Sequence, residues 1–334
     1  MPKKLWEPSK ALIRNSILFK YEKFVSKNYK YNFSGNYKKL LNWSLKNPED
    51  FWNSIWKYFE VIGIKTDKFK LSKDLINSKF FVNSKLNFSE NLLIKNSNQK
   101  AITFVSENGY REQKSWKELN IEVKKIITFY KKINISEKDR IAAYTPNQIE
   151  TVECFLSASA IGSIWSSCSP DFGVPGVIER FSQIKPKLLI ITDKYYYNGK
   201  EINIIERLPK ILKKIKSIKS VLVLNYPGKK LTKLKKIKNI KIYYFNEIKK
   251  LEISRNKLKK FNFDHELAIL YSSGTTGKPK CICHRSGGVL LQHLKEHQLH
   301  CNIKPNDNVF YFTTCGWMMW NWLVTALASK ASIL

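Results

Sequence analysis

A ten-residue segment rich in glycine, hydroxyl and lysine side chains is the part of this sequence best suited to chemistry. Residues 271–280 read Tyr-Ser-Ser-Gly-Thr-Thr-Gly-Lys-Pro-Lys and follow the apolar run 267–270, which is typical of a buried strand. Glycines let the backbone come close to an anion and point N–H groups at it. Hydroxyl groups add donors, and lysine adds a compact positive charge. The segment therefore predicts a loop that wraps a polyphosphate.

Two other interpretations of this segment are less favoured. A Walker A loop needs Gly-x-x-x-x-Gly-Lys-Ser/Thr, whereas here Gly274 and Gly277 are three residues apart and Lys-Pro-Lys follows the second. A simple polar turn after a strand uses the same residue types. A match over ten residues directly after a strand favours phosphate binding over such a turn.

Four further segments carry polar turns beside apolar runs. They are Leu-Asn-Phe-Ser-Glu-Asn-Leu at 86–92, Asp-Arg-Ile-Ala-Ala-Tyr-Thr-Pro-Asn at 139–147, Ile-Trp-Ser-Ser-Cys-Ser-Pro-Asp-Phe-Gly at 164–173 and Phe-Thr-Thr-Cys-Gly-Trp-Met-Met-Trp-Asn at 312–321. Helix caps and strand–turn–helix connections explain each of them by pattern alone. In the last one, Gly316 also permits close backbone approach, and the bulky residues after it can line a pocket.

Length and composition allow a large folded unit. A chain of 334 residues suffices for two ordinary domains or one large one, and 43% hydrophobic residues can fill a sizeable core. No apolar run approaches 18 residues, so no transmembrane helix is predicted.

The six cysteines are scattered and include no Cys-x-x-Cys pair. Cys281-x-Cys283-His284 is too tightly spaced for a zinc knuckle and alternates along an expected strand. We interpret the cysteines as reduced thiols and expect a cytoplasmic protein.

The net charge of +32 is open to two interpretations. Such a charge often indicates binding to nucleic acid or to an anionic membrane. However, 52 of the 59 basic residues are lysine and only 7 are arginine, the residue that nucleic-acid sites favour. The chain is also crowded with Asn, Ile and Tyr, which A/T-rich codons specify together with Lys. Coding bias is therefore the preferred explanation, and nucleic-acid binding is the minority one; a basic channel for a nucleotide and CoA would also benefit from the field.

Apolar strand-like runs alternate with amphipathic helical patterns from residue 101 onward. The expected strands are 101–105, 140–144, 163–167, 188–192, 221–225, 242–245, 267–271 and 309–313. The expected helices are 115–132, 148–161, 175–184, 203–216, 286–300 and 317–329. This alternation predicts an α/β fold of mostly parallel sheets with helices on both faces. Residues 1–96 are helix-leaning and rich in aromatics, and we predict them to be a helical N-terminal lead-in to a larger unit at 97–334.

Taken together and in this order, the segments resemble the acyl-adenylate-forming superfamily, which includes acyl-CoA synthetases, adenylation domains and luciferases. The loop at 271–280 resembles the phosphate-binding signature of that superfamily. The segments at 86–92, 165–173 and 313–321 are similar to patterns of one branch, the acetoacetyl-CoA synthetases. The opening Leu-Trp-Glu-Pro-Ser at 5–9 is similar to the start of that branch as well.

The resemblance implies that this chain is roughly the first half of a family member. Residues 97–334 would be the first part of the AMP-binding, or adenylating, domain. The family pattern continues with a Gly-Tyr-Gly-x-Thr-Glu-like segment for adenine and magnesium, an Asp for the ribose, a hinge, and a small C-terminal domain with a catalytic Lys, none of which is present in 1–334. We therefore expect this chain to be inactive alone. We also expect an unpaired sheet edge, prone to aggregation, at 331–334.

The resemblance further implies a ligase that joins acetoacetate to CoA with ATP through an acyl-adenylate, releasing pyrophosphate and then AMP. The side chains and backbone groups expected at the ATP phosphates are Ser273, Gly274, Thr275, Thr276, Gly277 and Lys280. Thr276 and Lys280 would stabilise charge during catalysis, and Thr276 would also contact the magnesium that accompanies ATP. Two alternatives stay open: another short-chain acyl-CoA synthetase, or a non-catalytic remnant that binds nucleotides or polyanions.

The remaining implied site residues serve the acid and CoA. Trp317, Met318 and Met319 match the acyl-pocket wall of related synthetases, although two core methionines would explain the pattern equally well. Lys200 lies in a stretch that matches a CoA-phosphate contact, where it would act as a point charge. In a chain with so many lysines, an ordinary surface lysine is the favoured alternative for Lys200.

Overall fold

The N-terminal region is built from four short helices and then from extended chain. The computed structural model describes residues 5–254, 256–272 and 277–334. The helices are α1 (Lys10–Asn15), α2 (Ile17–Tyr29), α3 (Tyr37–Lys46) and α4 (Pro48–Tyr58). Ser9, Ser16 and Asn36 begin the first three, because each side chain accepts a hydrogen bond from a free backbone N–H. Buried aromatic residues such as Tyr21, Trp43 and Trp56 join this layer to the main core.

After these helices the chain pairs with a segment far along the sequence. β1 (Gly63–Ile64) and β2 (Lys85–Leu86) form a three-stranded sheet with β12 (Phe261–Asn262), in the order β1-β2-β12. A 3-10 turn (Leu75–Asn77) lies between β1 and β2, and α5 (Phe88–Leu92) follows β2. The predicted lead-in region 1–96 therefore contains strands as well as helices.

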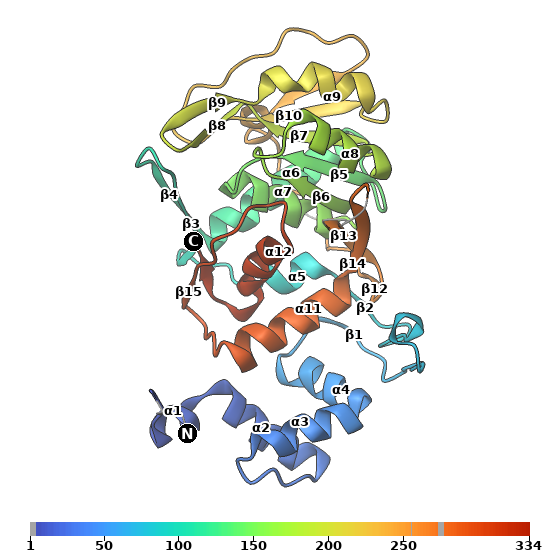
Figure 1. Ribbon diagram of the computed structural model, residues 1–334, viewed down its shortest axis with the longest axis vertical. Coiled ribbons are helices and arrows are strands. Elements are labelled where there is room, and N and C mark those ends of the chain that lie inside the picture. The colour runs from blue at the N-terminus through green and yellow to red at the C-terminus, as the bar shows by residue number, and fades with distance from the viewer. Residues whose placement is uncertain (1–4, 255, 273–276) are drawn as a thin grey trace.

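A seven-stranded sheet forms the centre of the structure (Figure 1). Its strands in spatial order are β11 (Lys241–Tyr244), β10 (Ser220–Leu224), β7 (Leu188–Thr192), β5 (Arg140–Tyr144), β6 (Ile164–Cys168), β13 (Glu266–Ser272) and β14 (Lys280–Arg285). All neighbouring pairs are parallel except β13 with β14. β6, β7 and β10 are buried at every residue, which is why they read as unbroken apolar runs.

Helices cover both faces of this sheet. α6 (Trp116–Lys132) and α7 (Ile149–Ala160) pack on one face, against a cluster that includes Ile141, Leu188 and Leu222. α8 (Val174–Ile184) and α9 (Leu208–Lys214) pack on the other face, against the neighbouring strand residues Ala142, Leu189 and Val221. Successive strand residues point to opposite faces of the sheet, so each strand contributes side chains to the hydrophobic clusters on both faces. The predicted α/β class with helices on both faces is confirmed.

A second sheet lies across α7 from the first. Its order is β15 (Asn308–Val309), β16 (Ser332–Ile333), β3 (Lys100–Val105) and β4 (Arg111–Ser115). β16 is parallel to both of its neighbours, and Ile333 pairs with Ile102. The predicted unpaired edge at 331–334 is therefore wrong, because β16 lies inside the sheet between β15 and β3. The predicted strand 309–313 shortens to Asn308–Val309, since the exposed residues Phe310, Tyr311 and Phe312 leave the sheet.

The other elements connect these layers. They are the hairpin β8 (Lys194–Tyr197) with β9 (Lys200–Asn203), a 3-10 turn (Ile205–Arg207), α10 (Phe245–Ile248), α11 (Ser286–Leu294), a π-helix (Lys295–His300), α12 (Met318–Thr325) and a final 3-10 turn (Ala326–Ser329). Among the described residues, every helix falls short of the length and apolarity that crossing a bilayer requires.

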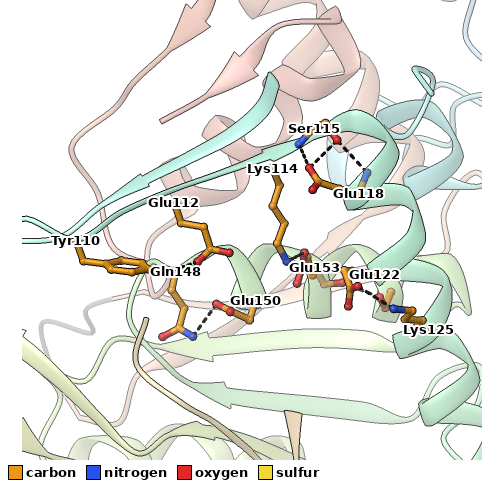
Figure 2. Close-up of polar contacts among 11 residues, drawn as sticks. Tyr110, Glu112, Lys114, Ser115, Glu118, Glu122, Lys125, Gln148, Glu150 and Glu153 are labelled. Atoms are coloured by element: carbon orange, nitrogen blue, oxygen red, sulfur yellow. Dashed lines mark hydrogen bonds and ion pairs between the residues drawn. The ribbon is translucent and has the colours of Figure 1, made fainter. Parts of the chain in front are cut away.

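A buried ionic cluster joins the second sheet to α7 (Figure 2). Lys114, on β4, donates through Nζ to Glu153 Oε1 on α7 at 2.6 Å, and the Glu153 side chain is completely buried. Glu150, one turn earlier on α7, accepts from Gln148 Nε2 at 3.0 Å. Glu122 on α6 pairs with Lys125 at 3.1 Å. Glu153 Oε2 and Glu122 Oε2 are both buried and have no hydrogen-bond partner among the described residues.

The cluster holds more negative than positive groups, and this perturbs its titration. Burial raises the pKa of Glu153 to about 7; Lys114 opposes the shift and the neighbouring charge of Glu150 adds to it. Burial also raises the pKa of Glu150. For Lys114, burial disfavours the charged form, but the carboxylates of Glu153 and Glu150 outweigh it and raise the lysine pKa above its usual value.

Lys114→Met is expected to destabilise the fold by about 3–5 kcal/mol, because it leaves Glu153 buried without its counter-charge. Urea unfolding of wild type and variant at neutral pH measures the effect. Lys259→Met is the matched control: Lys259 pairs with Glu137 at the same 2.6 Å, but its side chain is 69% exposed. That control should change stability by less than about 1 kcal/mol. Equal effects of the two substitutions would show that the buried pair contributes no more than a surface pair.

Glu153 should also make stability fall as pH rises from about 4.5 to about 7. Its pKa is raised in the folded chain, so the folded state holds a proton that the unfolded state has already released. The stability difference between Glu153→Gln, which cannot ionise, and wild type should therefore grow in favour of the variant across this range and level off above it. Urea unfolding at a series of pH values tests this, and a pH-independent difference would contradict the raised pKa.

Candidate active site

The strand order of the central sheet reverses between β5 and β6. From β5 the chain passes through α7 to β6 on one side, and then through α8 to β7 on the other side of β5. α7 and α8 consequently lie on opposite faces and diverge at the carboxyl ends of β5 and β6. Such a reversal opens a crevice, which is where parallel α/β sheets bind their ligands. β13 runs parallel to β6, so Ser272 at its carboxyl end, together with Lys280 paired to it, lies at the same edge.

The segment around Cys315 lies directly over this crevice. The Cys315 thiol donates to the carbonyl oxygen of Thr145, after β5, at 2.9 Å. Ser167, at the end of β6, donates through Oγ to the Cys315 carbonyl oxygen at 2.5 Å. A Cβ at Gly316 would lie 3.3 Å from the Ser169 backbone nitrogen and 3.4 Å from the Phe172 ring. Three of the polar segments singled out in the sequence therefore meet at one place.

Trp320 fixes the start of α12 against the sheet. Its indole Nε1 donates to Asn147 Oδ1 at 2.9 Å, and its ring stacks on Trp165 with a centroid distance of 6.5 Å. With Trp320 turned inward, Trp317 and Met318 face outward and are 64% and 43% exposed. Met319 is half-buried. Met318 is therefore accessible at the mouth of the crevice, and the role of all three residues at the acid stays a prediction.

The phosphate loop connects β13 to β14. Ser272 and Lys280 are paired at its base, and Gln183 Nε2, on α8, donates to the Pro279 carbonyl oxygen at 3.0 Å. Gly277 has φ +102°, a conformation that side-chain-bearing residues rarely adopt, and no atom lies within 4 Å of where its Cβ would be. Lys280 is exposed. Ser273, Gly274, Thr275 and Thr276 lie outside the described residues, so their predicted contacts are not tested.

Two arginines border the crevice, and the sequence reasoning did not single them out. Arg180, on α8, stacks its guanidinium 4.2 Å from the centre of the Phe172 ring and lies 5.7 Å from the ring of Tyr271. Arg207 donates through Nη1 to the Pro170 carbonyl oxygen at 2.8 Å and so fixes the turn after β6. Their rarity was a usable signal: in a chain where lysine supplies most of the positive charge, an arginine indicates a position that needs a planar, multidentate donor.

The turn after β6 is also held by acid–hydroxyl contacts. Asp171 accepts from Ser169 Oγ at 2.5 Å and from the Tyr195 hydroxyl at 3.3 Å. Tyr195 belongs to β8, so the β8–β9 hairpin is attached to the crevice through this contact. Burial, together with the neighbouring Asp171, raises the pKa of Tyr195 to about 12, and the phenol stays a neutral donor at physiological pH.

Lys200 and the predicted phosphate loop belong to elements on different sides of the central sheet. It begins β9 opposite Tyr197 and is exposed beside the tight turn at Asn198 and Gly199. The hairpin lies toward the β10 side of the sheet, whereas the loop joins β13 and β14 at the other side (Figure 1). A contact between Lys200 and CoA therefore stays a prediction about a more distant part of the site.

The cysteine-rich stretch is an ordinary strand. Cys281 and Cys283 lie on β14 opposite Tyr271 and Ile269, and all six cysteines are free. Within the part of the chain that the structure describes, no group of three or more His, Cys, Asp or Glu side chains is arranged to hold a metal ion.

Comparison with known proteins gives the same picture over the whole chain. The family model for the AMP-binding enzymes matches residues 94–333, and the model for the acetyl-coenzyme A synthetase N-terminus matches residues 37–92. The acetoacetyl-CoA synthetase of Gallus gallus is 39% identical over 99% of this chain and 50% of its own length. The acetoacetyl-coenzyme A synthetase of Rhizobium meliloti (strain 1021) is 36% identical over 98% of this chain and 50% of its own.

A solved structure also matches the fold of this chain. The acetoacetyl-CoA synthetase from Streptomyces lividans is similar with a TM-score of 0.91 and 28% identity, covering 99% of this chain and 51% of that one. The chain thus spans about half the length of the relatives it matches, and the resemblance to acetoacetyl-CoA synthetases is confirmed. With its crevice at the carboxyl ends of β5, β6 and β13, its matching family model and its matching fold, this chain belongs to the AMP-binding enzyme family.

Proposed function

We propose that the complete protein carrying this chain ligates acetoacetate to CoA with the consumption of ATP. The observation that supports it is the convergence of the two ends of the predicted phosphate loop, Ser272 and Lys280, with the turns after β5 and β6 and the segment around Cys315 at one sheet edge. The relatives named acetoacetyl-CoA synthetase support the choice of acid. In the first step an acid oxygen attacks the α-phosphorus of ATP and pyrophosphate leaves. In the second, the CoA thiolate attacks the acyl carbon and AMP leaves.

The chain's own groups would position and stabilise charge in this reaction, because little covalent chemistry falls to the protein. The loop that ends at Gly277 and Lys280 would hold the β- and γ-phosphates. Its glycine leaves open space for close backbone approach, and its lysine is exposed and free to reach an anion. Magnesium is expected to arrive with ATP and neutralise phosphate charge, with Thr276 as its contact. Trp317, Met318 and Met319 would line the acid, and Lys200 would meet a CoA phosphate.

The direct test is a substrate profile of the complete protein. Acetate, propionate, butyrate and acetoacetate are each supplied with ATP, magnesium and CoA, and AMP and thioester are measured. Preference for acetoacetate is the expected result. Preference for another acid would keep the reaction and replace the substrate, and no AMP from any of the four would overturn the proposal.

Thr276→Ala and Lys280→Ala are each expected to slow adenylation about 10–1000-fold in the complete protein, the effect of losing one preorganised contact to developing charge. Acid-dependent exchange of pyrophosphate into ATP measures this step without CoA. Lys278→Ala, which removes a charge from the same loop, should have a smaller effect if Lys280 makes a specific contact. Unchanged exchange in both test variants would remove these residues from the mechanism.

Enlarging the mouth of the acyl site should shift acid preference toward longer acids. Met318→Ala and Met319→Ala are expected to change the ratio of kcat/KM between successive straight-chain acids. The change should correspond to roughly 1–3 kcal/mol of transition-state binding free energy per methylene. Met319 is half-buried, so its variant should also lose stability, whereas the exposed Met318 should lose little. An unaltered acid preference accompanied by a lower Tm would mark both as packing residues only.

A further inference from the structure

Behind the acyl segment, which is Trp317–Met319 and is proposed above to line the acid, α12 packs against α11 and the π-helix through polar side chains. His293, near the end of α11, places Nδ1 3.0 Å from Thr325 Oγ1. His297, in the π-helix, sets its ring edge-on against Trp322 with a centroid distance of 4.3 Å. A π-turn is uncommon and is often found at functional positions. Two histidines therefore face α12, His293 from the regular helix α11 and His297 from the irregular π-helix that follows it.

Two buried side chains in this interface have polar atoms that make no hydrogen bond of ordinary length and angle, although the His297 ring lies against the Trp322 backbone. His297 is 0% exposed and Asn321 is 2% exposed. Neither ring nitrogen of His297 and neither amide atom of Asn321 has a hydrogen-bond partner within bonding geometry among the described residues. An unpaired buried polar group costs about 1–3 kcal/mol, and native proteins retain few of them. Four such atoms on two neighbouring elements are available to pair with a group from outside the chain.

The helical period connects these groups to the acyl segment. Residues three or four apart on a helix share a face, so Met318, Asn321 with Trp322, and Thr325 form one stripe along α12. The contacts of Trp322 and Thr325 show that this stripe faces His297 and His293. Its first residue, Met318, is exposed at the mouth of the crevice, and the next turn is buried and polar. One helical turn rises about 5.4 Å, which is on the scale of a four-carbon acid.

The Asn321 and His297 side chains bring polar but uncharged groups to this interface. Burial lowers the pKa of His297 to about 4, against a smaller opposite effect of the Trp322 backbone, and burial lowers the pKa of His293 to about 3. Both rings are therefore neutral at physiological pH, and each has one N–H donor. The nearest carboxylate, Glu296, already accepts from Trp322 Nε1 at 2.9 Å and Gln292 Nε2 at 2.6 Å. Neutral N–H donors suit a neutral acceptor such as a ketone oxygen.

We propose that Asn321 and His297 form a specificity subsite that donates hydrogen bonds to the 3-oxo group of a short 3-oxo acid, whose carboxylate lies toward Trp317 and Met318. This inference rests on the proposed function and adds the residues that select the acid. A site that must hydrogen-bond an oxygen strongly rejects the analogue that lacks it, because the buried donors are then left unpaired. Butyrate, which has a methylene in place of the ketone, is that analogue for acetoacetate.

The test compares acetoacetate with butyrate in the complete protein. Asn321→Leu replaces the amide by an apolar group of similar volume, which removes both unpaired atoms of Asn321 and should not prevent folding. The ratio of kcat/KM for acetoacetate to that for butyrate is expected to fall about tenfold or more, the equivalent of one lost hydrogen bond, with butyrate turnover kept or improved. His297→Phe should act in the same direction and serves as the second variant if Asn321→Leu folds poorly.

Ser329→Ala supplies the matched control. Ser329 is 3% exposed with an unpartnered Oγ, but it lies two turns further from the acyl segment than Asn321. Its substitution should leave the acid ratio unchanged. If Asn321→Leu and His297→Phe fold and also leave the ratio unchanged, the polar atoms pair only with buried water and the subsite is overturned. A wild-type protein that activates no acid would instead refute the proposed function, on which the subsite depends.

Discussion

The parallel run of β5, β6 and β13 is the constraint on which the rest of the structure depends. Parallel strands bring all their carboxyl ends to one edge, and the reversal between β5 and β6 separates the helices that follow them. Cys315 then bridges the two strand ends by bonding to Thr145 and Ser167. The segment around Cys315 is thereby fixed over the crevice. Because α12 begins three residues after Cys315, these two hydrogen bonds also fix where the helix starts.

The interior and the surface of this chain have opposite electrostatics. The net charge is +32, yet the space between β4 and α7 holds Glu150 and Glu153 against the single buried Lys114. Lysines on the surface stay solvated and contribute little individually. Burial, with a smaller contribution from the neighbouring Glu150, raises the pKa of Glu153 instead, so a proton on Glu153 becomes part of the packing between the two sheets. Bulk charge therefore says little about how the polar interior is arranged.

The sequence predicted most elements, since buried parallel strands and amphipathic helices have distinct periods. The strands at 101–105, 140–144 and 188–192 match β3, β5 and β7 within a residue. The short strands β1 and β12 were missed, and β16 was expected at a sheet edge instead of inside the sheet, because two residues carry no period and their pairing is set by distant segments. The segments of the crevice were recognisable from their motifs. Arg180, Arg207, Asn321 and His297 were not, since their meaning comes from what surrounds them in space.

The anchoring of Trp320 determines what every other residue of α12 can do. Its indole is held by Asn147 and stacked on Trp165, so the rotation of the helix about its axis is fixed at that point. At about 100° per residue, the stripe that contains Trp322 and Thr325 must then lie on a side of α12 away from Trp320, where it meets His297 and His293, while Trp317 and Met318 at the start of the helix stay exposed. The sheet thus sets, through one buried tryptophan, which side chains of α12 are exposed and which are buried against α11.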